Sequence, residues 1–370
     1  MKQEHKDIIK DTLPLVKDQG LKIVTNFYQR LFEKNPQLEG MFNMTHQVDV
    51  TQRQALLNSI IALAEHIENP EKLGDALDLI AHKHASVGVT EDHYPIVATN
   101  LMEAICDTLQ IEPNSKIHEA WLEAVKFAAG VLIGKEKTLY GGRKPQPIEV
   151  ALSNIVTEAT DVKSFIFKRT DGKDFKPHIP GQYVSLDVFS DQWDHSMKRQ
   201  YTITGVPQDT TSLQITTKLD PEGTVSRHLH LSSKIGDVFS ISEPFGNFTL
   251  DESNAPILFV SAGIGITPIY SLLKECERRG RKFHLVHGDR SVEHIPFYSD
   301  LKKVPKTIFL EEVRDGFEKG YVDLTKASIE EQVYLCGPQG FMQSQIGYLR
   351  SIKMDSLKIK YEFFGSLEDI

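Results

Sequence analysis

The sequence is poor in cysteine and has no long apolar run. Its three cysteines, Cys106, Cys276 and Cys336, form no CxxC pair and no Cys/His cluster, which argues against a zinc or iron–sulfur site. Scattered thiols of this kind are typical of a reducing cytoplasm. No apolar segment approaches the length of a membrane span, and the charged start MKQEHKDIIK does not resemble a secretory signal. We therefore expect a cytoplasmic protein without a membrane span.

The chain also lacks an excess of basic residues, internal repeats and low-complexity segments. Its net charge of -9 at pH 7 argues against a nucleic-acid-binding surface. Of its 370 residues, 40% are hydrophobic and 25% are charged, so the chain should fold throughout. This length is too great for one ordinary core and indicates two or three domains.

Residues 1–140 lack the alternation of β-strands and follow a helical period instead. Apolar side chains recur at i, i+4 and i+8 from Ile23 through Phe27 to Leu31, and again within residues 51–67. The pattern predicts an all-α domain.

One histidine in this part has the surroundings of a metal ligand. The pair Asn69-Pro70 should open a helix that carries Leu77, Ile80 and His84 on one face. A neutral imidazole among aliphatic side chains is a good ligand for iron. A core histidine bonded to a backbone carbonyl would give the same pattern, so the spacing alone leaves both interpretations open.

The residue composition and the periodicity of the sequence change after residue 140. Residues 141–147, GGRKPQP, read as a linker. Residues 148–254 contain short segments rich in Val, Ile, Thr and aromatics, which indicate an antiparallel β-barrel. In residues 255–370 strands and helices alternate, which indicates a doubly wound, mostly parallel α/β domain.

A glycine-rich turn opens this last domain. The segment SAGIGITP (261–268) follows the strand-like ILFV and precedes a helix, which is the arrangement of a pyrophosphate site. The third glycine of the dinucleotide fingerprint is replaced by Pro268, which fits the first turn of a helix.

Several further motifs occur in a fixed order along the chain. They are MFNMT (41–45), GQY (181–183), RQYTIT (199–204), GTVS (223–226), CGP (336–338) and YEFFG (361–365). Together with His84 and the glycine-rich turn, they resemble the motifs of the flavohaemoglobins over residues 1–370. The resemblance implies a globin at 1–140, an FAD-binding barrel at 148–254 and an NAD(P)-binding domain of the ferredoxin reductase type at 255–370.

The resemblance implies a haem b pocket in the globin part. His84 would be the iron ligand, Tyr28 the distal tyrosine that bonds the oxygen ligand, and Phe42 a phenylalanine wedged against haem. The other matched positions are Gln52 and Leu56 on the distal side, Tyr94 and Glu136 in contact with the proximal histidine, and Lys83 and Glu362 between flavin and haem. A carboxylate bonded to the histidine would suit oxygen activation. From the pattern alone, however, Glu136 would be a surface acid paired with a nearby lysine.

The resemblance also implies FAD and NADH or NADPH sites. Arg199 can bond the FAD pyrophosphate bidentately, Tyr201 can pack on the isoalloxazine, and Thr202 can bond its N5 edge. The other flavin positions are Tyr183, Gln200, Gly223, Thr224, Val225 and Ser226. The nicotinamide positions are Gly263, Ile264, Gly265, Ile266, Thr267, Pro268, Cys336, Gly337 and Pro338. The C-terminal positions that cover the flavin are Phe363, Phe364, Gly365 and Ser366; the family more often has Cys where Phe363 stands.

The activity implied by the resemblance is nitric oxide dioxygenation. NAD(P)H would reduce FAD, FAD would reduce haem, and the substrates O2 and NO would become nitrate. The shared cofactors leave open an NAD(P)H oxidase or hydroperoxide reductase, and a haem-based gas sensor is a further alternative. We expect a monomer without an obligate protein partner. The choice between NADH and NADPH stays open, because Asp289 suits a ribose 2′-hydroxyl whereas Arg290 suits a 2′-phosphate.

Overall fold

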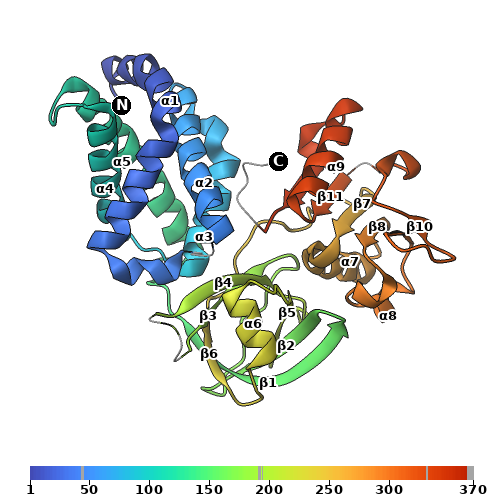
Figure 1. Cartoon of the computed structure of the whole chain (residues 1–370). Coiled ribbons are helices and arrows are strands. Elements are labelled where there is room, and N and C mark those ends of the chain that lie inside the picture. The colour runs from blue at the N-terminus through green and yellow to red at the C-terminus, as the bar shows by residue number, and fades with distance from the viewer. Residues whose placement is uncertain (43–45, 191–192, 194, 331, 365–370) are drawn as a thin grey trace. The chain divides into compact units, whose positions relative to one another are not determined.

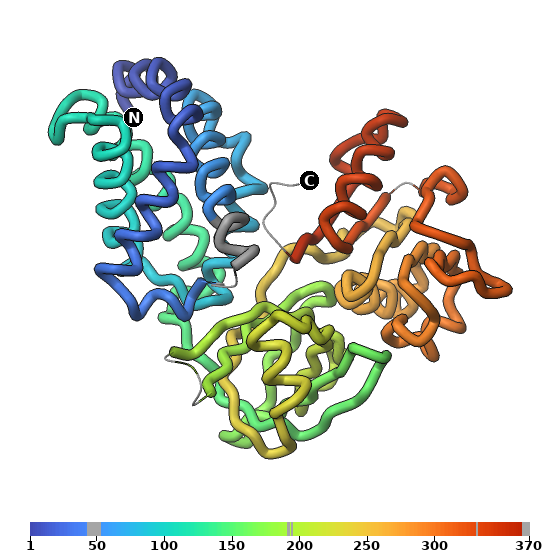
Figure 2. The backbone as a smooth tube through the Cα atoms, in the orientation of Figure 1, coloured from blue at the N-terminus to red at the C-terminus, as the bar shows by residue number. Residues whose placement is uncertain are grey.

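The computed structural model describes residues 1–42, 46–190, 193, 195–330 and 332–364, without the side chains of residues 46–52. The chain forms two compact units. The first contains Met1–Gln146 and Phe189–Lys198, and the second contains Pro147–Val188 and Arg199–Ile370. Figure 1 draws the ribbon, and Figure 2 traces the same backbone as a tube.

The first unit is helical, as predicted. Its elements are α1 (Gln3–Lys34), η1 (Pro36–Met41), α2 (His46–Glu65), η2 (Pro70–Leu73), α3 (Gly74–Val87), α4 (His93–Leu109) and α5 (Lys116–Leu139). The pair Asn69-Pro70 opens the short 3-10 turn η2, and α3 begins only at Gly74. No helix in the described part of the chain combines the length and apolarity that a membrane crossing requires.

The apolar stripes found in the sequence form the core of this unit. Helix α1 packs against α2, α4 and α5. Its residues Ile23, Phe27 and Leu31 are buried at 1%, 3% and 0% exposure. On α5, the indole of Trp121 is buried, and its Nε1–H donates to Thr12 Oγ1 of α1 at 3.0 Å. Each such side chain contributes about 1.5 to 3 kcal/mol through burial, so packing stabilises these helices more than intrinsic propensity does.

The second unit begins with a six-stranded sheet. The strands are β1 (Ile148–Ala159), β2 (Val162–Arg169), β3 (Tyr183–Val188), β4 (Met197–Thr202), β5 (Leu213–Lys218) and β6 (Val238–Ile241), and α6 spans Thr224–Leu231. Their order is β4-β3-β6-β1-β2-β5, with antiparallel pairing of β1 with β2 and β6. Beyond β4, Ile203 forms an antiparallel bridge with Ile215 of β5, so the two edges of the sheet meet. The sheet therefore closes as a barrel.

A parallel α/β lobe completes the second unit. Its strands are β7 (Ile257–Ala262), β8 (Phe283–Asp289), β9 (Lys306–Leu310), β10 (Glu318–Lys319), β11 (Gln332–Cys336) and β12 (Ile359–Glu362). Its helices are α7 (Ile266–Arg279), α8 (Tyr298–Leu301) and α9 (Gln339–Ser351). The order β10-β9-β8-β7-β11-β12 is parallel at every pair.

Alternate residues of β7 enter two different cores. Phe259 joins the core that contains α7, whereas Leu258 and Val260 join the core that contains α9. The sheet is thus covered on both faces, as in doubly wound proteins. The strand order reverses between β7 and β11, and ligands of such sheets bind at the carboxyl ends beside that reversal.

Candidate functional site

Three side chains from three helices meet at the predicted haem ligand. His84 stands in the last turn of α3, Tyr94 in the first turn of α4 and Glu136 in the last turn of α5. The Nδ1 atom of His84 lies 2.9 Å from Glu136 Oε1 and 3.2 Å from the Tyr94 hydroxyl. The Tyr94 hydroxyl itself donates to Glu136 Oε1. The structure therefore joins three of the predicted site residues directly.

Burial gives this group a defined proton arrangement. Glu136 is 2% exposed, so it is not the surface acid that its sequence surroundings suggest. Burial and the bond to Glu136 raise the pKa of Tyr94 well above its usual value, which keeps its hydroxyl protonated as a donor. An ionised carboxylate only accepts, so Nδ1 of His84 carries the hydrogen.

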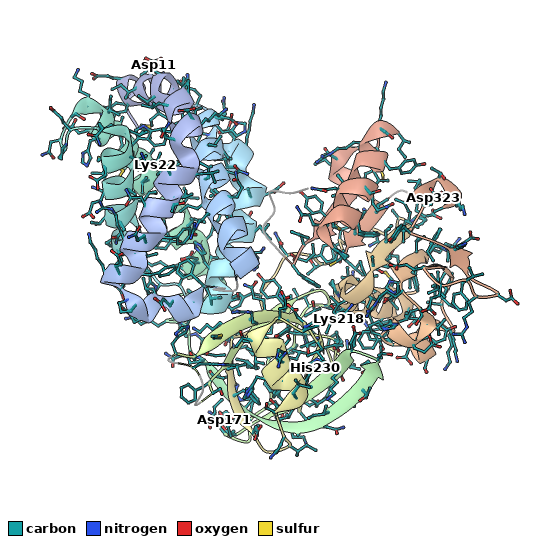
Figure 3. All side chains as sticks on the ribbon, viewed as in Figure 1. Asp11, Lys22, Asp171, Lys218, His230 and Asp323 are labelled. Carbon is teal, nitrogen blue, oxygen red and sulfur yellow. The ribbon has the colours of Figure 1, made fainter. Side chains whose placement is uncertain are left out.

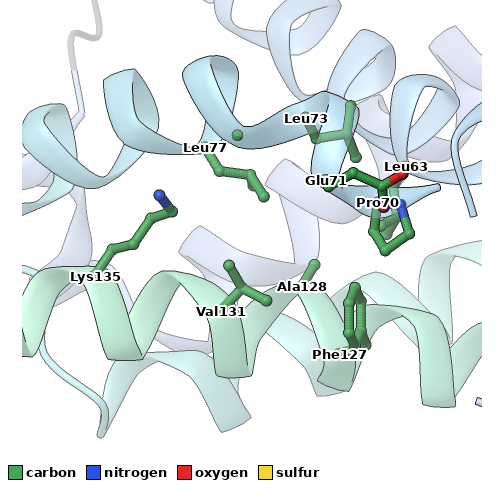
Figure 4. Close-up of a pocket in the computed structure, with 10 residues that line it drawn as sticks. Leu63, Pro70, Glu71, Leu73, Leu77, Phe127, Ala128, Val131 and Lys135 are labelled. Atoms are coloured by element: carbon green, nitrogen blue, oxygen red, sulfur yellow. The ribbon is translucent and has the colours of Figure 1, made fainter.

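The remaining nitrogen of His84 suits a metal ligand. Among the described residues, Nε2 has no hydrogen-bond partner, and with Nδ1 protonated it carries a lone pair. About two helical turns away on α3, Leu77 lines an apolar cavity of about 280 Å³ between α2, η2, α3 and α5. Figure 4 shows Leu77, Val131 and Phe127 around this cavity, with Lys135 at one end. An imidazole anchored through Nδ1, with Nε2 left to donate its lone pair, suits an iron ligand.

The end of α3 is held by residues that sequence reasoning missed. The hydroxyl of Tyr140 donates to Val89 O at 2.6 Å, and Nζ of Lys198 donates to Val87 O at 2.8 Å. Lys198 is the second residue of β4, and it belongs to the stretch Phe189–Lys198 that packs in the first unit. A cation at a helix C-terminus is favourable. Because Lys198 and Val87 lie 111 positions apart, no local sequence pattern predicts this contact.

The predicted distal residues form a second group. The ring of Tyr28 lies 5.8 Å from that of Phe42 and 5.8 Å from that of Phe32. Leu56 packs against the same core. Gln52 lies on α2, but its side chain is outside the described residues. The structure thus assembles Tyr28, Phe42 and Leu56 around one apolar cluster, and their function towards oxygen stays a prediction.

The predicted flavin residues lie along β4 and its neighbours. Arg199, Gln200, Tyr201 and Thr202 are the last four residues of β4, and burial lowers the pKa of Arg199. Before the buried Tyr183, Gly181 has φ +95°, and a Cβ there would lie 1.9 Å from Phe248 O. Only glycine fits this close approach. The GQY motif therefore has a structural reason as well as the predicted flavin function.

The predicted phosphate loop precedes helix α6. The helix begins at Thr224, and no side chain in the described part of the chain caps its N-terminus at Gly223. Val225 is 2% exposed and points into the core, so only its backbone could meet a ligand. The Ser226 hydroxyl accepts from Asp220 N at 3.2 Å and holds the loop. Uncapped first-turn N–H groups are suited to an anion.

The predicted nicotinamide motifs meet at the strand reversal. The turn Gly263–Gly265 follows β7 and leads into Ile266 and Thr267, which are buried. A Cβ on Gly265 would lie 2.3 Å from Cys336 O, so the turn and the CGP motif are in close contact. Cys336 is fully buried, and this burial raises the pKa of its thiol well above the usual value. A buried neutral thiol of this kind is a poor nucleophile.

The predicted C-terminal residues follow β12. Glu362 pairs in register with Cys336 and is 7% exposed, Phe363 is 9% exposed and Phe364 is 54% exposed. Gly365 and Ser366 lie outside the described residues. Lys83 precedes His84 on α3.

Comparison with known proteins agrees with this architecture. Family models match in three places: Globin at residues 25–132, Oxidoreductase FAD-binding domain at 149–250 and Oxidoreductase NAD-binding domain at 259–346. The flavohemoprotein of Chromobacterium violaceum is 32% identical over 99% of this chain and 98% of its own. Flavohemoprotein A of Dictyostelium discoideum is 32% identical over the full length of both chains.

Solved structures give the same result. The flavohemoglobin of Malassezia yamatoensis, determined with bound FAD and heme, has a TM-score of 0.91 at 28% identity and covers 99% of this chain and 100% of its own. The FAD/NAD-binding domain of a Vibrio cholerae nitric oxide dioxygenase has a TM-score of 0.55 at 26% identity, covering 59% of this chain and 98% of its own. The predicted fold class and resemblance are confirmed: this chain belongs to the flavohaemoglobin, or flavohemoprotein, family.

Proposed function

We propose that this protein is an NAD(P)H- and O2-dependent nitric oxide dioxygenase, an oxidoreductase that converts NO to nitrate. The observation that carries the proposal is the bond between His84 Nδ1 and the buried Glu136, in a chain that also carries FAD- and NAD-binding parts. A strongly basic proximal ligand favours oxygen activation over storage. The similarity of this chain to the FAD/NAD-binding domain of the Vibrio cholerae nitric oxide dioxygenase supports the same reaction.

We propose the domain limits 1–140 for the globin, 141–147 for the linker, 148–254 for the FAD domain and 255–370 for the NAD(P) domain. The ranges matched by the three family models lie within these limits, which supports them. A single chain with all three parts supports a self-sufficient monomer. Three free cysteines support a cytoplasmic location.

His84 would hold haem b through Nε2, with Phe42 and Leu56 as apolar neighbours. When bound, FAD converts two-electron nicotinamide chemistry into one-electron steps, and haem supplies the oxygen chemistry. Glu136 holds the proton on Nδ1 of His84 and keeps the imidazole oriented. Tyr94 donates a second hydrogen bond to the same carboxylate oxygen and so limits its movement. On the distal side, the Tyr28 hydroxyl would donate to oxygen, with Gln52 near it.

Residues of the second unit would bind the other two cofactors. Arg199 would neutralise the FAD pyrophosphate, and the N-terminus of α6 would offer N–H groups to phosphate. The turn Gly263–Gly265 would approach the pyrophosphate of NAD(P)H, since it lies at the strand reversal. Phe364, which is half exposed, would cover the flavin face that nicotinamide must reach.

The experiment that tests this function compares NADH consumption under three conditions. Purified protein loaded with haem and FAD is given NO with O2, a hydroperoxide, or O2 alone, and nitrate is measured. We expect fast consumption with NO, and one nitrate for each NO removed. Faster turnover with peroxide, or NO-independent consumption of equal rate, would contradict the proposal.

A further inference from the structure

The carboxylate of Asp161, in the barrel, forms an ion pair with Arg290, one of the two residues between which the choice of NADH or NADPH stays open. Asp161 stands in the turn between β1 and β2, and Arg290 directly follows β8. Arg290 Nη2 lies 2.6 Å from Asp161 Oδ2, and Nζ of Lys218 lies 3.5 Å from the same oxygen. Figure 3 labels Lys218 on the barrel. All three residues belong to the second unit, so this pair is part of one compact body.

Neighbouring bonds fasten the same two segments. The backbone N–H and the hydroxyl of Thr160 both donate to Glu293 O at 3.0 Å. The side chain of Glu293 in turn accepts from Arg314 Nη1 at 2.9 Å. The turn between β1 and β2 is therefore bound to the segment after β8 by hydrogen bonds to the backbone as well as by an ion pair. These bonds fix the position of Asp161 relative to Arg290.

Arg290 lies where a dinucleotide is read in this kind of sheet. Strands β7 and β8 are parallel neighbours, with Ala262 opposite Gly288. The glycine-rich turn follows β7, and Arg290 follows β8 at the same edge of the sheet. The residue after this second strand reads the ribose, an acid selecting a 2′-hydroxyl and an arginine accepting a 2′-phosphate.

The structure separates the two candidate residues. The Asp289 side chain is 4% exposed, accepts from Arg290 N at 2.8 Å and lies 3.6 Å from Nε2 of the buried His287. The Arg290 side chain is 47% exposed. On the adjoining strand end, Glu311 and Glu312 are exposed acids whose N–H groups donate to Asp289 O and Arg290 O. Arg290 is thus the accessible cation, and the carboxylate that meets it is that of Asp161.

We propose that Asp161 is a specificity-determining residue for the nicotinamide nucleotide. By neutralising Arg290, it deprives a 2′-phosphate of its cationic partner and makes the site favour NADH over NADPH. The proposal rests on the NAD(P)H-oxidising function proposed above. In contrast to the usual arrangement, the determinant comes from the flavin barrel and not from the nucleotide-binding lobe.

The test uses nucleotide fragments that lack nicotinamide. Binding of 5′-ADP and of 2′,5′-ADP to the full-length, FAD-loaded protein is measured by titration calorimetry. Asp161→Asn should strengthen 2′,5′-ADP binding relative to 5′-ADP about tenfold, because it frees a guanidinium for a charge-assisted bond. The double variant Asp161→Asn/Arg290→Gln should return the ratio to within about twofold of the wild type. In Asp161→Asn, the rate of FAD reduction by NADPH relative to that by NADH should rise as well.

The matched control is Asp171→Asn, which removes the carboxylate paired with Arg169 elsewhere on the barrel. It should leave the ratio unchanged. An unchanged ratio in Asp161→Asn overturns the proposal. Should that variant fail to fold, Arg290→Gln alone decides: a tenfold fall in the ratio would mean that Arg290 already binds the phosphate, whereas a ratio within about twofold supports the proposal. ADP binding needs neither haem nor NO, so failure of the dioxygenase function would not affect this result.

Discussion

The Nδ1 atom of His84 lies 2.9 Å from Oε1 of Glu136, although 52 positions separate the two residues in the chain. The carboxylate is buried, so its charge is poorly screened and acts on both the imidazole and the Tyr94 hydroxyl. Such a bond fixes the tautomer, orients the ring and raises the basicity of the free nitrogen. The electronic properties of the haem site should therefore depend on this one acid.

Glu136→Gln tests that dependence, because the amide keeps the shape and removes the charge. Loss of about 1.4 kcal/mol of charge-assisted bonding would raise the haem midpoint potential by about 60 mV. A spectroelectrochemical titration of the haem bands measures the change, and FAD content should stay constant. The control Glu112→Gln changes an exposed acid. Equal potentials in the two variants would show that Glu136 acts only in packing.

His84→Ala removes the proposed iron ligand. We expect most haem to be lost, while FAD binding and NADH-driven reduction of ferricyanide persist, because these belong to the second unit. Absorption spectra of the purified variant measure both cofactors. His82→Ala, on the same helix, is the control and should retain haem. Full haem occupancy with an unchanged spectrum in His84→Ala would remove His84 from the site.

Arg199→Ala tests the flavin site in the same way. The variant should release FAD, since a bidentate phosphate donor is lost. Oxygen binding by the dithionite-reduced protein should persist, because it belongs to the globin part. Fluorescence of FAD released on dilution gives the affinity. Wild-type affinity in this variant would contradict the assignment.

Periodicity predicted the fold well because both units bury regular apolar patterns. The stripe of Ile23, Phe27 and Leu31 became core, and the alternating residues of β7 cover two faces. Glu136 shows the limit of this reasoning. Its immediate neighbours suggest a surface acid, yet it lies four residues after the buried Leu132 and so on the inward face of α5. That spacing was a signal that could have been used.

Contacts between distant elements could not be predicted from the sequence. Lys198 caps α3 from the start of the barrel strand β4, and Asp161 reaches Arg290 across 129 positions. Both are ordinary charged surface residues by local pattern. Only the tertiary packing of their segments determines which partner each one meets.

Asp251 gives a prediction about stability and pH. Burial raises the pKa of this carboxyl, but bonds from Gln332, Arg281 and Ser253 outweigh it and lower the pKa to about 2. The side chain of Arg281 is fully buried, so Asp251→Asn should cost about 3 kcal/mol at pH 7. Because its pKa is lower in the folded state, the carboxylate stabilises the protein at pH values above the unfolded pKa of 3.8. This stabilisation is lost as the pH falls through about 2. Urea unfolding of both proteins at several pH values should show the difference shrinking below about pH 4.

Tyr28→Phe tests the reaction itself, because it removes one hydroxyl and keeps the ring. The ring packs edge-on against Phe27 at 4.9 Å and beside Phe42, so stability should change by less than about 1 kcal/mol. O2 in a haem pocket carries partial negative charge, and a phenol donor to it contributes about 1.5 to 3 kcal/mol. Oxygen dissociation should therefore rise roughly tenfold to a hundredfold, and NO consumption at limiting O2 should fall. Stopped-flow dissociation and an NO electrode measure the two effects.

Tyr140→Phe is the control: it removes the hydroxyl that holds the end of α3 and should lower stability without changing oxygen dissociation. If dissociation and turnover of Tyr28→Phe both match the wild type, Tyr28 is a core residue, and oxygen is stabilised by another donor.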